Sequence, residues 1–203
     1  MRHLATPALP AKSKLCFDGA VVRWALCAVV SASAIACGET PVEYSATPLR
    51  INELSPVNKT WQDELGNFGA WLELYNTATK DFDLNGCYLS NGVGHRFKFA
   101  FPEGVVVPAH EVLLVWADKK SDMSTETAPH VDFKIHAEND GVWLSDPSGY
   151  LVDSVEYANL PPNDAGTETT SLARFPDGTG EFQWCSVATP SSPNGRRCSG
   201  QAL

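Results

Sequence analysis

The sequence predicts an all-β domain, an antiparallel sandwich or barrel of short strands. Three observations lead to this fold class. Apolar residues recur at a spacing of two along several segments, turn residues separate those segments, and no window of helical length keeps a 3.6-residue apolar period free of Gly or Pro. The length of 203 residues is enough for one domain of ordinary size with additional terminal segments.

The first strands are marked by apolar content and by turns. Residues 71–75 (WLELY) and 112–117 (VLLVWA) are apolar on both sides, which is typical of inner strands. Between them, residues 97–101 (FKFAF) place three phenylalanines on one face and predict a strand with one buried face. An Asn-Gly pair at 85–86 interrupts the segment that precedes it.

The C-terminal half continues the pattern. Apolar and polar residues alternate along residues 131–135 (VDFKI). Residues 142–145 and 150–157 flank a D-P-S-G turn, so they predict a hairpin with a four-residue loop. Asp153 is a polar exception on the apolar face of its strand. Only residues 116–127 have room for a turn of helix, and their charges suit a loop.

The first 36 residues differ from the rest and are typical of a secretory signal peptide. Four basic residues face one acidic residue, and an uncharged run of 13 residues follows at 24–36. This run is shorter than the ~20 apolar residues that a membrane-spanning helix needs. We therefore expect residues 1–36 to direct export and to be removed.

The end of this run resembles the lipobox of bacterial lipoproteins. In residues 34–38 (AIACG), small residues precede a cysteine. The resemblance implies that Cys37 carries a lipid, that the protein is exported to the cell envelope, and that it contacts the membrane only through this lipid anchor. Ala34 stands where the lipobox usually has Leu. The alternative is ordinary cleavage after Ala34 or Ala36, which gives a secreted protein. Residues 37–48 are small, polar and proline-bearing, as in a tether.

The charge of the chain restricts its partners. The net charge is −9, and without residues 1–36 it is −12, because 11 basic and 23 acidic residues remain. Nucleic acid and anionic lipid repel such a surface, so no nucleic-acid partner is expected. The acidic balance favours basic proteins or cation-bridged glycans.

Six motifs, in this order, resemble the lamin tail domain family in its bacterial secreted form. They are residues 49–54 (LRINEL), 71–76 (WLELYN), 83–90 (DLNGCYLS), 142–157 (VWLSDPSGYLVDSVEY), 173–178 (ARFPDG) and 189–194 (TPSSPN). The resemblance covers residues 48–194. It implies an immunoglobulin-like antiparallel β-sandwich at 49–194, with a C-terminal tail at 195–203, and an interaction or attachment unit. Cys87 stands where the family has Trp.

Four cysteines remain after the predicted signal. In an oxidising compartment we expect Cys185 and Cys198 to form a disulfide that closes a loop of 14 residues and stabilises the fold by ~3 kcal/mol. The alternatives are Cys87–Cys185 and Cys87–Cys198. In the expected pairing Cys87 is a buried free thiol.

Two glutamates lie in strands that are otherwise apolar, where a carboxylate must find hydrogen-bond donors. Glu53 and Glu73 are interpreted as structural acids that meet Arg174 or backbone N–H groups. The alternative is a calcium site with Glu53, Asp63, Glu64 and Glu73 as oxygen ligands. Arg174 is expected to bind a carboxylate or carbonyl groups at the edge of the core. No cofactor is expected.

Two functions from different classes follow. The first is a non-catalytic module that binds a protein or polysaccharide partner through loops at one end, such as residues 118–129 and 159–170. The second is a metal-dependent cell-surface hydrolase that uses His130, Asp132 and His136, which could share one face of a strand. The sequence contains no H-E-x-x-H, G-x-S-x-G or P-loop motif, and this favours the first function.

Overall fold

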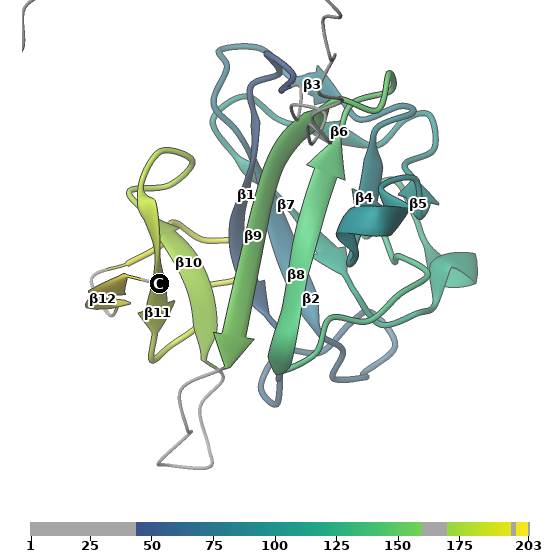
Figure 1. The fold of residues 1–203 in the computed structure, drawn as a ribbon. Coiled ribbons are helices and arrows are strands. Elements are labelled where there is room, and N and C mark those ends of the chain that lie inside the picture. The colour runs from purple at the N-terminus through teal and green to yellow at the C-terminus, as the bar shows by residue number, and fades with distance from the viewer. Residues whose placement is uncertain (1–43, 160–169, 196–197, 203) are drawn as a thin grey trace, which may run out of the picture. The chain divides into compact units, whose positions relative to one another are not determined.

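The computed structural model describes residues 44–159, 170–195 and 198–202 (Figure 1). These residues form antiparallel sheets and two single-turn 3₁₀ helices, so the predicted all-β fold class is confirmed. The strands are β1 (Leu49–Ser55), β2 (Trp71–Asn76), β3 (Phe82–Asp83), β4 (Tyr88–Ser90), β5 (Phe99–Ala100), β6 (Val106–Val107), β7 (Val112–Trp116), β8 (Glu138–Ser145), β9 (Leu151–Asn159), β10 (Ser171–Phe175), β11 (Glu181–Cys185) and β12 (Cys198–Ala202). The 3₁₀ helices are η1 (Val93–His95) and η2 (Ser121–Met123).

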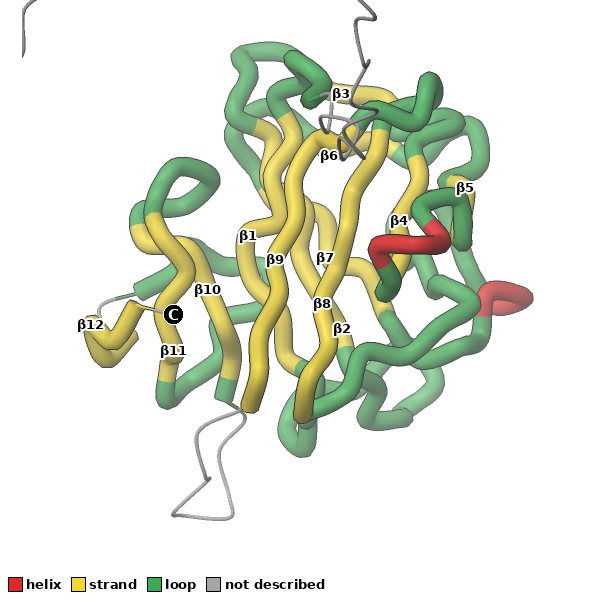
Figure 2. The backbone as a smooth tube through the Cα atoms, viewed as in Figure 1, coloured by secondary structure: helices red, strands yellow, loops and turns green. Residues whose placement is uncertain are grey.

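Two sheets form the sandwich. One has six strands in the order β12-β11-β10-β1-β2-β7, the other has four in the order β5-β4-β8-β9, and β3 and β6 make a short separate ribbon. In Figure 2, β8 and β9 lie across β1, β2 and β7. Leucines and valines of both sheets fill the space between them: Leu54, Leu72, Leu74, Val115, Leu172, Leu89, Val142, Leu144 and Val155. Among the described residues, no helix is long and apolar enough to cross a membrane.

Strands β1 and β2, in the middle of the six-stranded sheet, are buried on both faces. Leu72 and Leu74 of β2 point into the main core, whereas Trp71 points to the other face, where it packs with Trp116 and Ala188 in a separate cluster. Ala188 belongs to the closing segment, which we define as residues 186–194. Cover on both faces explains why this strand is apolar on both sides.

The predicted hairpin between β8 and β9 is confirmed. The N–H of Gly149 donates to the carbonyl of Asp146 at 2.9 Å, and the Asp146 carboxylate accepts the N–H groups of Ser148 and Tyr150 at 2.9 and 3.0 Å. The strand pairing shifts next to the turn of the hairpin, where Ser145 lies opposite Leu151 and Leu144 lies opposite Asp153. This bulge changes the alternation along β9.

The strand predicted at residues 97–101 is only partly present. Phe99 and Ala100 form β5, and Phe101 is buried, but Phe97 is 62% exposed. The Phe97 ring packs edge-on against Tyr88 with 4.8 Å between ring centroids. The prediction for Phe97 was wrong because this residue lies in the turn before β5.

Residues 131–135 keep their alternation without forming a ladder. Val131, Phe133 and Ile135 are buried, and the polar residues between them are exposed. Only isolated bridges connect this segment to β7 and the residues after it, between Trp116 and His130 and between Asp118 and Lys134. Burial on one side therefore does not require a full strand.

Both predicted terminal segments contribute backbone pairing. At the end of the predicted tether, Tyr44 forms a parallel bridge with Leu151, and the N–H of Ser45 donates to the Leu151 carbonyl at 2.7 Å. In the predicted C-terminal tail, β12 pairs with β11 and adds the outermost strand of the six-stranded sheet.

Candidate functional site

Glu53 of β1 and Glu73 of β2 lie directly opposite each other on the outer face of the six-stranded sheet, and both are fully buried. The closing segment covers them. Glu53 accepts the N–H of Thr189 and its hydroxyl, each at 3.0 Å, and Glu73 accepts the N–H of Ser191. The donors are thus backbone N–H groups and a hydroxyl, as the structural interpretation of these acids requires.

The environment of this pair favours a proton on one of the two acids. Burial raises the pKa of Glu53. Burial, followed by the charge of Glu53, raises the pKa of Glu73 to about 8. The second carboxylate oxygen of Glu73, Oε2, has no hydrogen-bond partner among the described residues. At neutral pH this environment therefore favours the protonated form of Glu73.

Asn52 connects its own motif at 49–54 with the motifs at 173–178 and 189–194, which lie far away in the sequence. It occupies the bulge of β1 and is fully buried. Its side chain donates to Asp177 Oδ1 at 2.8 Å and accepts the N–H of Gly178 at 2.9 Å. Asn194 of the closing segment donates to the Arg174 carbonyl at 2.9 Å and to the Asn52 carbonyl at 3.4 Å. Sequence reasoning found these motifs, but it did not find that they meet at Asn52.

Arg174 binds a carboxylate and two carbonyl groups, which confirms its predicted role. Its Nη2 lies 2.9 and 3.0 Å from the two oxygens of Asp153. Its Nε donates to the Ile51 carbonyl and its Nη1 to the Gly180 carbonyl, both at 2.9 Å. Asp153, the polar exception on β9, is therefore the partner of this arginine.

Asp63 and Glu64 lie in the loop between β1 and β2, outside the strands that carry Glu53 and Glu73. Asp63 accepts the N–H groups of Leu65 and Asn67 at 3.0 and 2.7 Å, and Lys120 Nζ at 3.3 Å. Burial raises the pKa of Asp63, but these donors, with the Asn67 side chain, outweigh it and lower the pKa to about 2. Asp63 is thus held as a carboxylate.

The four acids proposed as calcium ligands are not brought together. Glu53 and Glu73 accept hydrogen bonds from the closing segment. Asp63 lies next to Lys120, and Glu64 lies next to His130. Within the part of the chain that the structure describes, no three His, Cys, Asp or Glu side chains are placed to hold a metal ion.

His130 is fully buried between two carboxylates. Its Nδ1 lies 3.0 Å from Asp118 Oδ1 and its Nε2 lies 3.2 Å from Glu64 Oε1. Its ring stacks on Trp116 of β7 with 6.2 Å between ring centroids. Sequence reasoning missed Asp118 as its partner, because 12 residues separate the two in the chain.

The predicted cluster of His130, Asp132 and His136 is wrong. Asp132 and His136 are exposed, and His136 Nδ1 lies 2.9 Å from Asp140 Oδ2. The alternation that buries residues 131, 133 and 135 turns both of these side chains to solvent, whereas His130 precedes it and turns inward. The three residues share no face, so the hydrolase hypothesis has no common site for them.

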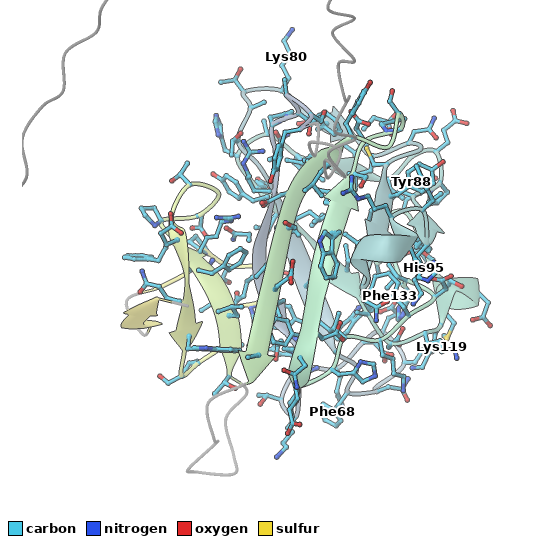
Figure 3. The ribbon with its side chains drawn as sticks, viewed as in Figure 1. Phe68, Lys80, Tyr88, His95, Lys119 and Phe133 are labelled. Atoms are coloured by element: carbon cyan, nitrogen blue, oxygen red, sulfur yellow. The ribbon has the colours of Figure 1, made fainter. Side chains whose placement is uncertain are left out.

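The loop between β1 and β2, residues 56–70, presents large apolar side chains to solvent. Trp61 is 44% exposed, Leu65 57% and Phe68 53%. Figure 3 shows Phe68 projecting beyond the end of the strands. Three of the eight exposed large apolar side chains among the described residues thus lie in this one loop, which makes it a candidate interaction site.

Hydrogen bonds within the loop hold this apolar group in place. The Asn58 amide nitrogen donates to the Trp61 carbonyl at 2.6 Å and to the Gly69 carbonyl at 2.9 Å, which draws both ends of the loop together. Nearer the tip, the N–H of Asp63 donates to the Asn67 carbonyl at 2.8 Å. The apolar loop is thus internally braced, and a partner would not have to order it.

The apolar loop lies at the end of the sandwich opposite to the point where the chain enters. Ser55 pairs with Trp71, and Trp71 pairs with Trp116, so the loops that follow β1 and β7 leave the sheet at the same end. Of the two loops predicted for binding, residues 118–129 follow β7 at this end and contain η2. In the other, 159–170, the segment 160–169 lies outside the described residues.

The cysteines of the mature chain fall into a pair on neighbouring strands, a buried free thiol, and Cys37. Cys185 of β11 lies directly opposite Cys198 of β12, a pairing that brings Cα atoms within the range a disulfide needs. Cys87 is a free and buried thiol, so neither alternative pairing through Cys87 is formed, and burial raises its pKa to about 11. Cys37 lies outside the described residues.

Comparison with known proteins assigns the family. The Lamin Tail Domain family model matches residues 43–159, more than half of the 203 residues. No curated protein matches the chain. The match ends with β9, yet β10 to β12 extend the same sheet that contains β1 and β2. Lamin tail domains are in general non-catalytic, immunoglobulin-like modules, and this chain belongs to the Lamin Tail Domain family.

Proposed function

We propose that this chain is a non-catalytic attachment module, held at the cell envelope by a lipid on Cys37, that binds a protein or polysaccharide partner. The observation that carries the proposal is the braced apolar loop. Exposed Trp and Phe side chains on one braced loop are of the aromatic kind that is enriched at the core of interfaces, and Trp is among the residues that dominate binding energy there. The acids of this loop do not oppose binding, because Asp63 is paired with Lys120 and Glu64 with His130.

The position of the loop agrees with attachment through the N-terminal side. Tyr44 pairs with the start of β9, at the opposite end of the sandwich from the apolar loop. An anchor placed before Tyr44 therefore joins the domain at one end and leaves Trp61, Leu65 and Phe68 available at the other.

Binding to envelope fractions tests the function. We expect the purified protein carrying Cys37→Ser, which cannot hold the lipid that would itself sediment with membranes, to bind isolated envelope, and the double substitution Trp61→Ser and Phe68→Ser in this background to reduce that binding at least tenfold, because two apolar anchors are lost. Separate membrane and cell-wall polysaccharide fractions show which kind of partner is bound. Tyr150→Ser removes an exposed aromatic side chain at the other end and is the matched control. Equal binding by all three proteins contradicts the proposal.

Mass spectrometry of the purified mature chain tests the anchor and the disulfide together. We expect a lipid-modified Cys37 as the first residue and a peptide linking Cys185 to Cys198 under non-reducing conditions. The linked peptide is expected because β11 and β12 hold the two residues opposite each other. An unmodified N-terminus refutes lipidation, and a complete peptide map that lacks the link refutes the disulfide.

A further inference from the structure

A pocket of about 450 Å³ lies on the outer face of the six-stranded sheet, beside the closing segment. Four parts of the chain line it: Tyr75 of β2, residues 110–112 at the start of β7, Asp177 of the turn between β10 and β11, and residues 191–193 of the closing segment. The volume is within the range of about 300–1,000 Å³ that is usual for small-ligand sites. In Figure 1 this face of the sheet is turned away from the viewer, because β8 and β9 lie in front of it. We call this site the acidic pocket.

The acidic pocket has an uncompensated negative charge. Glu111 and Asp177 belong to its lining, and the described lining contains no lysine or arginine. With His110 neutral, the two carboxylates give the lining a charge of −2. Within the described residues, neither carboxylate has a Lys, Arg or His nitrogen within 4.0 Å. The pocket therefore attracts cations and repels anions.

Asp177 is held in a fixed orientation in this pocket. Its Oδ1 accepts a hydrogen bond from the side-chain amide of Asn52 at 2.8 Å and another from the N–H of Asn194 at 3.2 Å. Its other oxygen, Oδ2, accepts no hydrogen bond from the residues that the structure describes. Burial is the main cause that raises the pKa of Glu53 and of Glu73, and the charge of Asp177 adds to it. The buried acids behind the pocket thus increase its negative charge and cannot balance it.

Tyr75 supplies an aromatic wall next to these carboxylates. It lies on the outer face of β2, because side chains alternate along a strand and Leu74 points into the core. The Tyr75 ring packs closely on Gly178, where a Cβ atom would lie 2.4 Å from a ring carbon. Gly178 directly follows Asp177, so one turn positions both the ring and the carboxylate. Arg50 lies opposite Tyr75 in the β1–β2 ladder, but its guanidinium donates to the carbonyls of residues 47 and 49.

A guanidinium group matches this combination of an aromatic wall and spread acceptors. It is planar, it stacks on aromatic rings, and it carries five N–H donors. The pocket offers it the carboxylates of Asp177 and Glu111 and the hydroxyl groups of Ser191 and Ser192. A lysine ammonium is a compact point charge without a planar face. A metal ion is not expected, because among the described residues no three His, Cys, Asp or Glu side chains are placed to hold one.

We propose that the acidic pocket binds an arginine side chain of a protein partner. The guanidinium lies against the Tyr75 ring and donates to Asp177 and Glu111. An amino sugar supplies an ammonium group and no guanidinium, so a polysaccharide matches the pocket less well. The pocket shares no residue with the apolar loop, so this inference adds a second binding site and goes beyond the proposed function. It agrees with the expectation that the acidic balance favours basic proteins.

An NMR titration with short capped peptides tests the inference. The protein is the full mature chain with Cys37→Ser, and each peptide has one arginine, lysine or citrulline between glycines. Citrulline has the shape of arginine and no charge. We expect the arginine peptide to shift the amide signals of residues 110–112 and 191–192, the lysine peptide to bind severalfold more weakly, and the citrulline peptide not to bind. Raising the salt concentration from about 0.1 M to about 1 M shortens the screening length from about 10 Å to about 3 Å and should weaken arginine binding.

Two substitutions in the pocket and one control test which residues bind the peptide. Glu111→Gln is the main variant, because the Glu111 side chain makes no hydrogen bond within the described residues and its loss leaves the fold intact. We expect Glu111→Gln to weaken arginine binding severalfold, and its combination with Asp177→Asn to weaken it at least tenfold. Thermal unfolding checks that the double variant is folded. Glu138→Gln is the matched control, because it neutralises an exposed carboxylate of β8 in the other sheet.

Several results would overturn the inference. They are the absence of shifted signals in the pocket, equal binding of the citrulline or the lysine peptide, an equal loss in Glu111→Gln and Glu138→Gln, and tighter binding of glucosamine oligomers or calcium ions at the same residues. Binding to envelope through Trp61 and Phe68 is measured separately. Loss of arginine binding therefore removes this inference alone and leaves the proposed function in place.

Discussion

Replacing Glu73 by Gln is expected to remove most of the dependence of stability on pH between about pH 5 and pH 8. In the folded protein, burial and the neighbouring Glu53 raise the pKa of Glu73 from 4.5 to about 8. The unfolded chain releases this proton above pH 4.5, so unfolding releases a proton throughout this range. The free energy of unfolding of the wild type therefore falls as pH rises, with a limiting slope of about 1.4 kcal/mol per pH unit.

The sign of this effect distinguishes Glu73 from an ion-paired acid. The stability that its bound proton contributes is fully present below pH 4.5 and is lost as pH rises through about 8. Glutamine has the shape of the protonated acid and no charge. Glu73→Gln should therefore resemble the wild type near pH 5 and be more stable than it by several kcal/mol near pH 8.

Chemical denaturation at a series of pH values measures this difference. The comparison between wild type and Glu73→Gln measures the proton linkage of the Glu53 and Glu73 pair, because the charges of these two acids act on each other. Glu103→Gln changes an exposed carboxylate to an amide and should leave the slope unchanged. Parallel pH profiles for the wild type and Glu73→Gln would show that Glu73 is ionised in the folded protein.

The fold was predictable because its main signals are local. Alternation and turn residues are properties of a few adjacent positions, and they identified the β8–β9 hairpin and the buried strands β2 and β7. The same local rule failed at Phe97, where the chain turns before β5 begins. It also failed to distinguish the ladder-free segment at 131–135 from a strand, because burial on one side produces the same pattern in both.

The contacts of the candidate site were less predictable, because they depend on which distant segments meet. The sequence showed that Glu53 and Glu73 need donors, but the donors lie 136 and 118 residues away in the closing segment. The sequence pointed to His130 but assigned it Asp132 and His136 as partners. Its true partner is Asp118, which lies close to it because the chain forms a bridge between Trp116 and His130.

Arg174 connects four strands, and this gives it a large expected effect. Asp153 belongs to β9, Ile51 to β1, and Gly180 directly precedes β11. The ladder between β1 and β10 pairs Glu53 and Leu54 only. Ile51 lies outside this ladder, and side chains take the place of a strand partner there. Its N–H donates to the Asp153 carboxylate at 2.9 Å, and its carbonyl accepts a hydrogen bond from Arg174. The guanidinium also lies 4.2 Å from the centre of the Phe182 ring.

Arg174→Ala is expected to lower the free energy of unfolding by about 3 kcal/mol, because it leaves the Asp153 carboxylate without its cation and two carbonyls without a donor. Most of this loss should come from the unpaired charge, since the Arg174 and Asp153 side chains are only 15% and 13% exposed. Adding Asp153→Asn should then recover part of the loss, and a double-mutant cycle from urea denaturation measures this coupling. Arg50→Ala is the control, because among the described residues the Arg50 side chain donates hydrogen bonds to the carbonyls of nearby residues 47 and 49 and forms no ion pair. Additive losses in the cycle would mean that Arg174 and Asp153 stabilise the sandwich independently, and that the link between the two sheets lies elsewhere.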